Sequence, residues 1–93
     1  MNCYLVRTEK GRFVIFARDV VELFEILEEE TVPYGADIWE LEFHAGFRLH
    51  LGEELSAKNL LQHAIPRKIT KAELDYAFDS LYGDMFYEQI KVH

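Results

Sequence analysis

The sequence predicts an α+β domain, 1–93, in which a mainly antiparallel sheet of two β-hairpins and a C-terminal strand is packed by two to three helices. The stretches CYLVRTEKGRFVIFA and DIWELEFHAGFRLHL each place two β-rich runs around a short segment that ends in glycine. Two other stretches, starting at Asp19 and Thr70, combine a helix-capping pair with apolar residues at helical spacing. The predicted order of elements is ββα ββ αα β.

The first hairpin is predicted to have a three-residue loop, Glu9 to Gly11, with Gly11 in the left-handed conformation. This loop sets the facing pairs Val6–Val14, Tyr4–Phe16, Leu5–Ile15 and Cys3–Ala17. Both sides of the hairpin are apolar. We therefore expect it to be central in the sheet or covered on both faces, by the C-terminal helices or by a second copy of the chain.

The second hairpin is predicted to turn at Gly46. Its register places three facing pairs on the core side, against Phe24 and Leu27 of the first helix: Phe43–Phe47, Leu41–Leu49 and Trp39–Leu51. The other side pairs Glu42 with Arg48 and Glu40 with His50, which is favourable chemistry for a face exposed to water.

Three helices are expected. Asp19 and Glu22 form a capping box for the first, which buries Val20, Leu23, Phe24 and Leu27 and ends before the sequence VPYG. The stretch EELSAKNLLQHAI predicts a second helix with Leu60, Leu61 and Ala64 inward, ended by Pro66.

Thr70 and Glu73 form a second capping box. The third helix then buries Leu74, Ala77, Phe78 and Leu81 and takes Gly83 as its C-cap. The residues after it, MFYEQIKV, favour a last strand by their β-branched and aromatic content. The alternative is that the helix continues, because Phe78, Leu81, Tyr82, Met85 and Phe86 also fall at helical spacing.

Charge is distributed unevenly. Residues 19–54 hold eleven of the 17 acidic residues and a single base, Arg48, whereas residues 1–18 are net positive. The net charge of −7 disfavours direct binding to nucleic acid or to an anionic membrane. The sequence also lacks a run of about 20 apolar residues and a signal peptide. Cys3 is the only cysteine, so an internal disulfide is excluded; we expect a buried thiol and a cytoplasmic setting.

No catalytic, metal-binding or nucleotide-binding motif is present, so the sequence predicts a protein that is not an enzyme and has no cofactor. Four histidines occur without metal-ligand spacing. Residues 57–82 resemble a helix-turn-helix in outline, and DNA binding through them is an alternative. The turn is longer than usual, however, and the face that would contact DNA carries Glu73 and Asp75.

The most informative charges are Glu28, Glu29 and Glu30, at the C-terminal end of the first helix. An exposed carboxylate there costs about 0.3–1 kcal/mol, and the like-charge pair Glu25–Glu29 adds about 0.2–0.5 kcal/mol. Two explanations account for these unfavourable charges. The carboxylates are solvated surface, or they are retained because they contact a partner. The second explanation predicts a partner-binding surface on the first helix and the water-exposed face of the second hairpin: Glu22, Glu25, Glu28, Glu29, Glu30, Asp37, Glu40, Glu42, Glu53 and Glu54.

These features predict a small acidic binding module whose partner is a protein with a basic surface. Small acidic proteins without motifs include inhibitors that block nucleic-acid-binding sites by charge mimicry, such as phage and plasmid anti-defence proteins, anti-CRISPR inhibitors and immunity proteins. This comparison concerns class and composition only. The first alternative is a small subunit or homodimer that buries the apolar outer side of the first hairpin, and the second is the helix-turn-helix.

Overall fold

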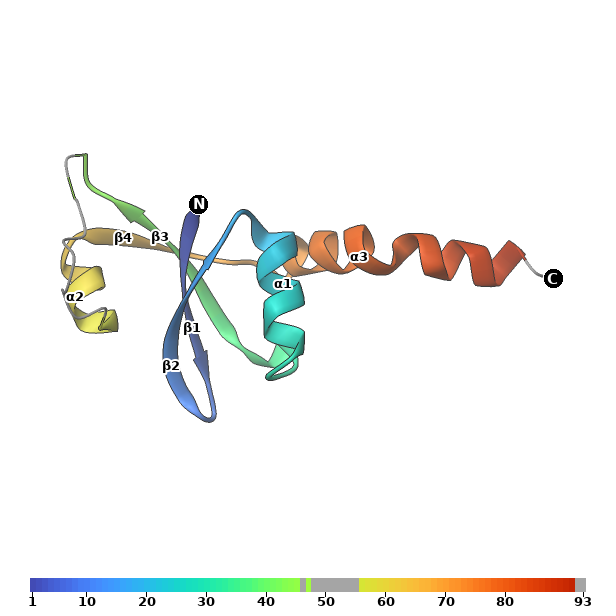
Figure 1. Ribbon diagram of the computed structural model, residues 1–93, viewed down its shortest axis with the longest axis horizontal. Helices are drawn as coiled ribbons and strands as arrows, with labels where there is room; N and C mark the ends of the chain where they lie inside the picture. Colours follow the sequence, from blue (N-terminus) through green and yellow to red (C-terminus); the bar gives the residue numbers. More distant parts are fainter. Residues whose placement is uncertain (46, 48–55, 92–93) are drawn as a thin grey trace.

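The computed structural model describes residues 1–45, 47 and 56–91, with side chains up to residue 83. It has the expected α+β architecture (Figure 1), with a four-stranded antiparallel sheet of order β2-β1-β3-β4. The elements are β1 (Asn2–Thr8), β2 (Gly11–Ala17), α1 (Val20–Glu28), the 3-10 turn η1 (Pro33–Gly35), β3 (Asp37–Phe43), α2 (Ala57–Gln62), β4 (Ala64–Lys68) and α3 (Lys71–Lys91).

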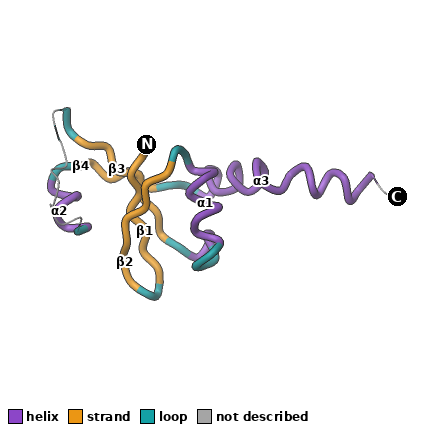
Figure 2. The backbone as a smooth tube through the Cα atoms, viewed as in Figure 1, coloured by secondary structure: helices purple, strands orange, loops and turns teal. Residues whose placement is uncertain are grey.

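Alternate residues of the central strand β1 point to opposite sides of the sheet. Because residues on both sides are apolar, both faces of the sheet are covered by other elements. Tyr4 and Val6 pack with α1 and the first part of α3, in a cluster that includes Leu23, Phe24, Leu27, Ile38, Ile69, Leu74 and Ala77. Cys3 and Leu5 pack on the other face in a smaller cluster with Leu41, Leu60 and Ala64. The tube view shows α2 at one end of the sheet and α1 with α3 at the other (Figure 2). The expected cover on both faces of the first hairpin is confirmed for β1, and the chain itself supplies both covers, while Phe16 of β2 stays 40% exposed.

The register of the first hairpin is one residue away from the predicted one. Tyr4 faces Ile15 and Leu5 faces Val14, across a two-residue loop that places Gly11 at the start of β2. Gly11 has the expected positive φ, +126°. Because both sides of this hairpin are apolar, the hydrophobic pattern does not distinguish the two registers. As a result Phe13 and Ile15 pack on the face of α1, not beside Cys3 and Leu5.

Strand β3 has different partners from those predicted. Trp39 faces Leu5 of β1 and Lys68 of β4, and Leu41 faces Cys3 and Pro66. Both edges of β3 are therefore occupied at these positions, so the predicted pairs Trp39–Leu51 and Leu41–Leu49 are wrong.

The other expectations for the second hairpin have mixed outcomes. The pair Glu40–His50 is also wrong, because Glu40 faces Tyr4 and Arg67. Three of the predictions lie outside the described residues, because they fall on residues 46 and 48–55. They are the turn glycine, the pair Glu42–Arg48 and the second strand of the hairpin. The start of the turn agrees with the prediction: the rings of Phe43 and Phe47 stack at 4.7 Å.

The predicted core of the second hairpin is also corrected. Trp39, Leu41 and Phe43 pack on the face covered by α2, whereas Phe24 and Leu27 of α1 cover the opposite face through Ile38. A strand contributes to both cores of a two-sided sheet, and here the odd-numbered residues of β3 belong to the smaller one.

Helix α1 agrees with the prediction except at Val20, which is only partly buried. The Asp19 carboxylate accepts a hydrogen bond from the Glu22 backbone N–H at 2.9 Å, and Leu23, Phe24 and Leu27 are buried. The Glu22 side chain reaches back to the Arg18 backbone N–H at 3.1 Å, one residue before the cap.

The second predicted helix is shorter than expected. Ser56 caps α2, which ends at Gln62, and Ala64 and Pro66 belong to strand β4. Proline is tolerated there because β4 is an edge strand. Since β4 separates α2 from α3, and the two helices cover opposite faces of the sheet, residues 57–82 do not form a helix-turn-helix.

The predicted C-terminal strand and the C-cap at Gly83 are wrong, because α3 continues through Gly83 to Lys91. A glycine inside a helix costs roughly 1 kcal/mol relative to alanine, which is less than the penalty that ends a helix at proline. The fourth strand of the sheet is instead β4. The second half of α3 extends away from the rest of the molecule (Figure 1).

Candidate protein-binding surface

The structure divides the ten predicted partner-binding acids into three groups. Glu22, Asp37 and Glu40 form ion pairs within the chain. Glu25, Glu28, Glu29, Glu30 and Glu42 form no ion pair with a described lysine or arginine. Glu53 and Glu54 lie outside the described residues.

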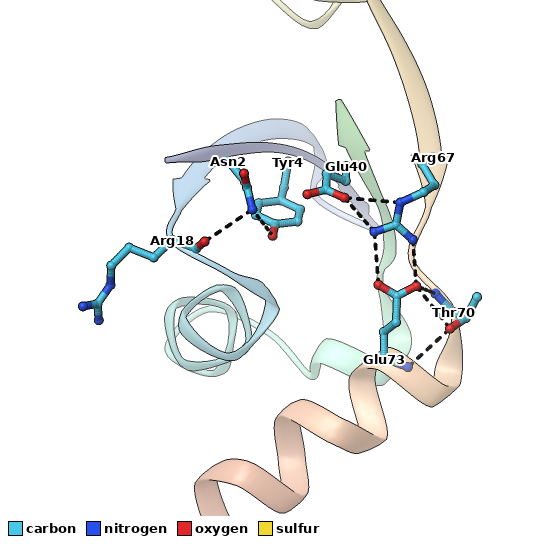
Figure 3. Close-up of polar contacts among 7 residues, drawn as sticks. All are labelled: Asn2, Tyr4, Arg18, Glu40, Arg67, Thr70 and Glu73. Atoms are coloured by element: carbon cyan, nitrogen blue, oxygen red, sulfur yellow. Dashed lines mark hydrogen bonds and ion pairs between the residues drawn. The ribbon is translucent and has the colours of Figure 1, made fainter. Parts of the chain in front are cut away.

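Glu40 belongs to a network that ties the sheet to α3 (Figure 3). The Arg67 guanidinium on β4 binds Glu40 of β3 at 2.6 Å and Glu73 of α3 at 2.9 Å. Glu73 is also the reciprocal partner of Thr70 in the capping box. The hydrogen bonds from Arg67 lower the pKa of Glu73, with a further contribution from the Thr70 backbone N–H. Glu40 therefore has a structural role.

Asp37 is similarly engaged. Its two carboxylate oxygens accept from Lys68 at 2.7 Å and from Arg7 at 2.8 Å. These hydrogen bonds, that of Lys68 first, lower the pKa of Asp37. A carboxylate that is already paired within the chain attracts a basic partner weakly, so Asp37, with two cations, and Glu40, with Arg67, leave the candidate surface.

The end of α1 is different. Glu25, Glu29 and Glu30 are exposed, and the last turn of the helix contains no basic residue. The helix terminus is closed by backbone hydrogen bonds from Glu30 and Thr31 to the Leu27 carbonyl oxygen. None of these three carboxylates meets a cation in the described part of the chain.

Glu28 has an internal partner that is not a cation. The Tyr82 hydroxyl of α3 donates a hydrogen bond to the Glu28 carboxylate. This bond, together with burial and the charges of Glu28 and Glu25, raises the pKa of Tyr82. Glu28 thus helps to join α1 to α3.

A second tyrosine makes a similar contact near the start of α3, with the carboxylate on α3. The hydroxyl of Tyr34, in η1, donates to the Asp75 carboxylate at 2.7 Å. This hydrogen bond raises the pKa of Tyr34 to about 12, with smaller contributions from burial and from the charges of Asp75 and Asp79. A chain of ring contacts connects the two sites, from Tyr34 through Phe24 and Phe78 to Tyr82.

Asp75 and Asp79 therefore extend the acidic surface from α1 onto α3. They lie one helical turn apart, on the same side of α3 as Tyr82. The sequence does not connect them with this surface, because they are more than 40 residues from Glu30 along the chain. The feature of the sequence that could have identified them is their helical spacing from Tyr82, which places all three residues on one side of the predicted third helix. We define the acidic surface by these residues: Glu25, Glu28, Glu29, Glu30, Asp75 and Asp79. It leaves out Glu22, which is paired with Arg18, and Glu42, which lies at the end of β3 that packs with α2.

Other kinds of site receive little support from the described residues. Among them, no three histidine, cysteine, aspartate or glutamate side chains gather closely enough to hold a metal ion. Cys3 is buried, and burial raises the pKa of its thiol to about 11, which makes it a poor nucleophile. Among residues 1–45 and 56–91, no helix has the length and apolar character needed to cross a membrane.

Comparison of the chain with protein-family models, curated proteins and solved structures gives no match.

Proposed function

We propose that this protein is a non-enzymatic binding module that uses the acidic surface to occupy a basic site on another protein. The observation that supports this most is the contrast among its own acids. The chain pairs Asp37 and Glu40 with cations, yet leaves Glu25, Glu29 and Glu30 exposed at a helix end where they are unfavourable.

The composition of the surface also supports the proposal. Tyr34 is 41% exposed among the carboxylates, and tyrosine is enriched in protein interfaces because it combines a large apolar ring with a polar group. Ile26 is exposed on α1, beside Glu25 in the sequence. A basic partner would thus meet spaced negative charge together with apolar area that strengthens the complex once it forms.

The partner that fits this pattern is a protein with a basic nucleic-acid-binding site, which the acidic surface would block by charge mimicry. Inhibitors of mobile-element or immunity type work in this way. The lone, buried Cys3 suits the reducing conditions of the cytoplasm, which we propose as the location.

The test compares three forms of the immobilised protein in capture from a lysate of the source cell. The double variant Glu29→Lys/Glu30→Lys changes the surface, and Glu9→Lys/Glu42→Lys makes the same change in net charge at exposed residues outside it. We expect the wild type and the control to retain the same basic protein, which a salt gradient releases early because surface charges are screened.

The captured protein is then tested for binding to an oligonucleotide. The proposal predicts that adding the wild-type module displaces the oligonucleotide and that the Glu29→Lys/Glu30→Lys variant does so at least about tenfold less well. Equal capture and displacement by all three forms would reject the acidic surface as the binding site.

A homodimer is the second candidate, now on different grounds. The apolar side of the first hairpin that suggested it is covered by α2, and Cys3 and Leu5 are each only 4% exposed. The outer edge of β2, however, pairs with no strand in the described part of the chain, and Phe16 on it is 40% exposed. Light scattering of the wild type and a Phe16→Lys variant tests this: a dimer that becomes a monomer supports it, and a monomeric wild type rejects it.

A further inference from the structure

The face of the sheet covered by α2 has the opposite charge character to the acidic surface. Arg7 on β1 and Lys68 on β4 lie over the ring of Trp39 on β3, and Arg12 on β2 faces Arg7. The Arg7 guanidinium carbon is 5.3 Å and the Lys68 ammonium nitrogen 4.5 Å from the centre of the Trp39 ring. Two cations therefore contact one indole, with a third on the next strand, in a chain whose net charge is −7.

Arg7 and Arg12 form a directly opposed cross-strand pair. Like charges in that position are unfavourable. Arg7 is partly neutralised, because its guanidinium shares the Asp37 carboxylate with Lys68. Arg12 is exposed and forms no ion pair within the described residues. After Asp37 is counted, this region keeps an excess of positive charge, which an anion can neutralise.

The same residues surround a shallow pocket of about 200 Å³. Apolar groups from Leu5, Trp39, Leu61 and Pro66 line it, and Arg7 and Arg12 form its charged side. Sites for drug-sized ligands are about 300–1,000 Å³, so this pocket is closer in size to a single side chain. We call it the basic pocket, defined by Leu5, Arg7, Arg12, Trp39, Leu61 and Pro66.

We propose that the basic pocket binds an acidic peptide segment that inserts one apolar side chain between Trp39 and Leu61 and places flanking carboxylates against Arg12 and Arg7. A peptide fits both features because it supplies a small apolar anchor and negative charge on either side of it. A long nucleic acid fits less well, since the pocket is small and the rest of the chain would repel phosphates. The proposal is independent of the acidic surface, which binds a partner of the opposite charge.

Trp39 is the only tryptophan, so intrinsic fluorescence reports on this pocket directly. The probe is an end-blocked peptide of sequence Glu-Asp-Glu-Leu-Glu-Asp-Glu. We expect it to change the Trp39 emission saturably, and more weakly at high salt. A peptide with serine in place of leucine tests the anchor, and one with glutamine and asparagine in place of the acids tests the charge. Each should bind at least about tenfold less tightly.

Arg12→Glu is the informative protein variant, because Arg12 is exposed and unpaired among the described residues, so the fold does not depend on it. It should weaken binding of the acidic peptide by about tenfold or more, the value of one lost charge contact. Lys10→Glu, in the neighbouring loop, makes the same charge change outside the pocket and should alter affinity less than about twofold. Circular dichroism confirms that both variants are folded.

A second measurement needs no variant. Relative to their quenching of free tryptophan amide, iodide should quench Trp39 fluorescence more than caesium does, because Arg7 and Lys68 lie over the ring. Equal relative quenching by the two ions, equal binding of the serine peptide, or tighter binding of an oligothymidylate than of the acidic peptide would each overturn the proposal.

Discussion

Strand β3 and the C-terminal end of α1 contain the same type of side chain in two settings. On β3, Asp37 meets Arg7 of β1 and Lys68 of β4, and Glu40 meets Arg67 of β4. At the end of α1, Glu29 and Glu30 meet none in the described part of the chain. Charge at the first region holds the fold together, whereas charge at the second is available to another molecule. A count of acids in the sequence does not separate the two roles.

The largest expected effect concerns the core that holds α1 in place. Leu23 is fully buried between α1 and the sheet, so Leu23→Ala should lower the free energy of unfolding by about 2–5 kcal/mol. Urea denaturation measures this. Ile65→Ala is the control, because Ile65 is 60% exposed on β4 and should cost much less. If the two variants lose the same stability, α1 is not packed as described and the acidic surface has no fixed geometry.

The next effect tests the structural role of the paired acids. Arg67→Met removes the cation shared by Glu40 and Glu73 and should cost about 1 kcal/mol, since the network is partly exposed. Lys71→Met removes an exposed cation that forms no ion pair with a described residue, and should change stability by only a few tenths of a kcal/mol. Equal effects of the two variants on the urea midpoint would show that the network contributes nothing specific.

The pH dependence of stability sharpens the same comparison. Arg67 lowers the pKa of Glu73 in the folded state below its ordinary value of 4.5. A lowered folded pKa means that this stabilisation is present above pH 4.5 and is lost as the pH falls through the folded value. Urea midpoints measured on acidification should therefore fall more steeply for the wild type than for Arg67→Met. Parallel curves would contradict the assignment of Glu73 to this network.

The sequence predicted the fold class, the helix cap at Asp19, the capping box of Thr70 and Glu73 and most of the buried stripe of α1, because these helix features depend on local chemistry within one turn. It did not predict the partners of β3. The alternation around Gly46 favours a local hairpin, but the side of β3 that such a hairpin needs is taken by β4, whose Pro66 is typical of a helix end in the local pattern. Competition between distant strands for one edge is not visible in a local pattern.

Only part of the candidate site was predicted, because the rest of it also depends on contacts between distant parts of the chain. Glu28, Glu29 and Glu30 follow one another at the C-terminal end of α1, and Glu25 lies one turn before Glu29, so their conflict is visible in the sequence. The pairing of Glu40 with Arg67 and the approach of Asp75 to Tyr34 depend on tertiary packing. The residues in these contacts are 27 and 41 positions apart in the sequence, so a local pattern cannot predict either contact.

The most direct test of the central claim measures stability and binding in the same variant, Glu29→Lys/Glu30→Lys. It leaves Glu28 in contact with Tyr82 and converts the repulsive pair Glu25–Glu29 into an attractive one. We expect unfolding to require about 0.5–1 kcal/mol more free energy, because lysines complement the helix terminus, while affinity for the captured basic partner falls by about tenfold or more. A variant that is more stable and still binds that partner at full strength would show that these glutamates are solvated surface and not a binding site.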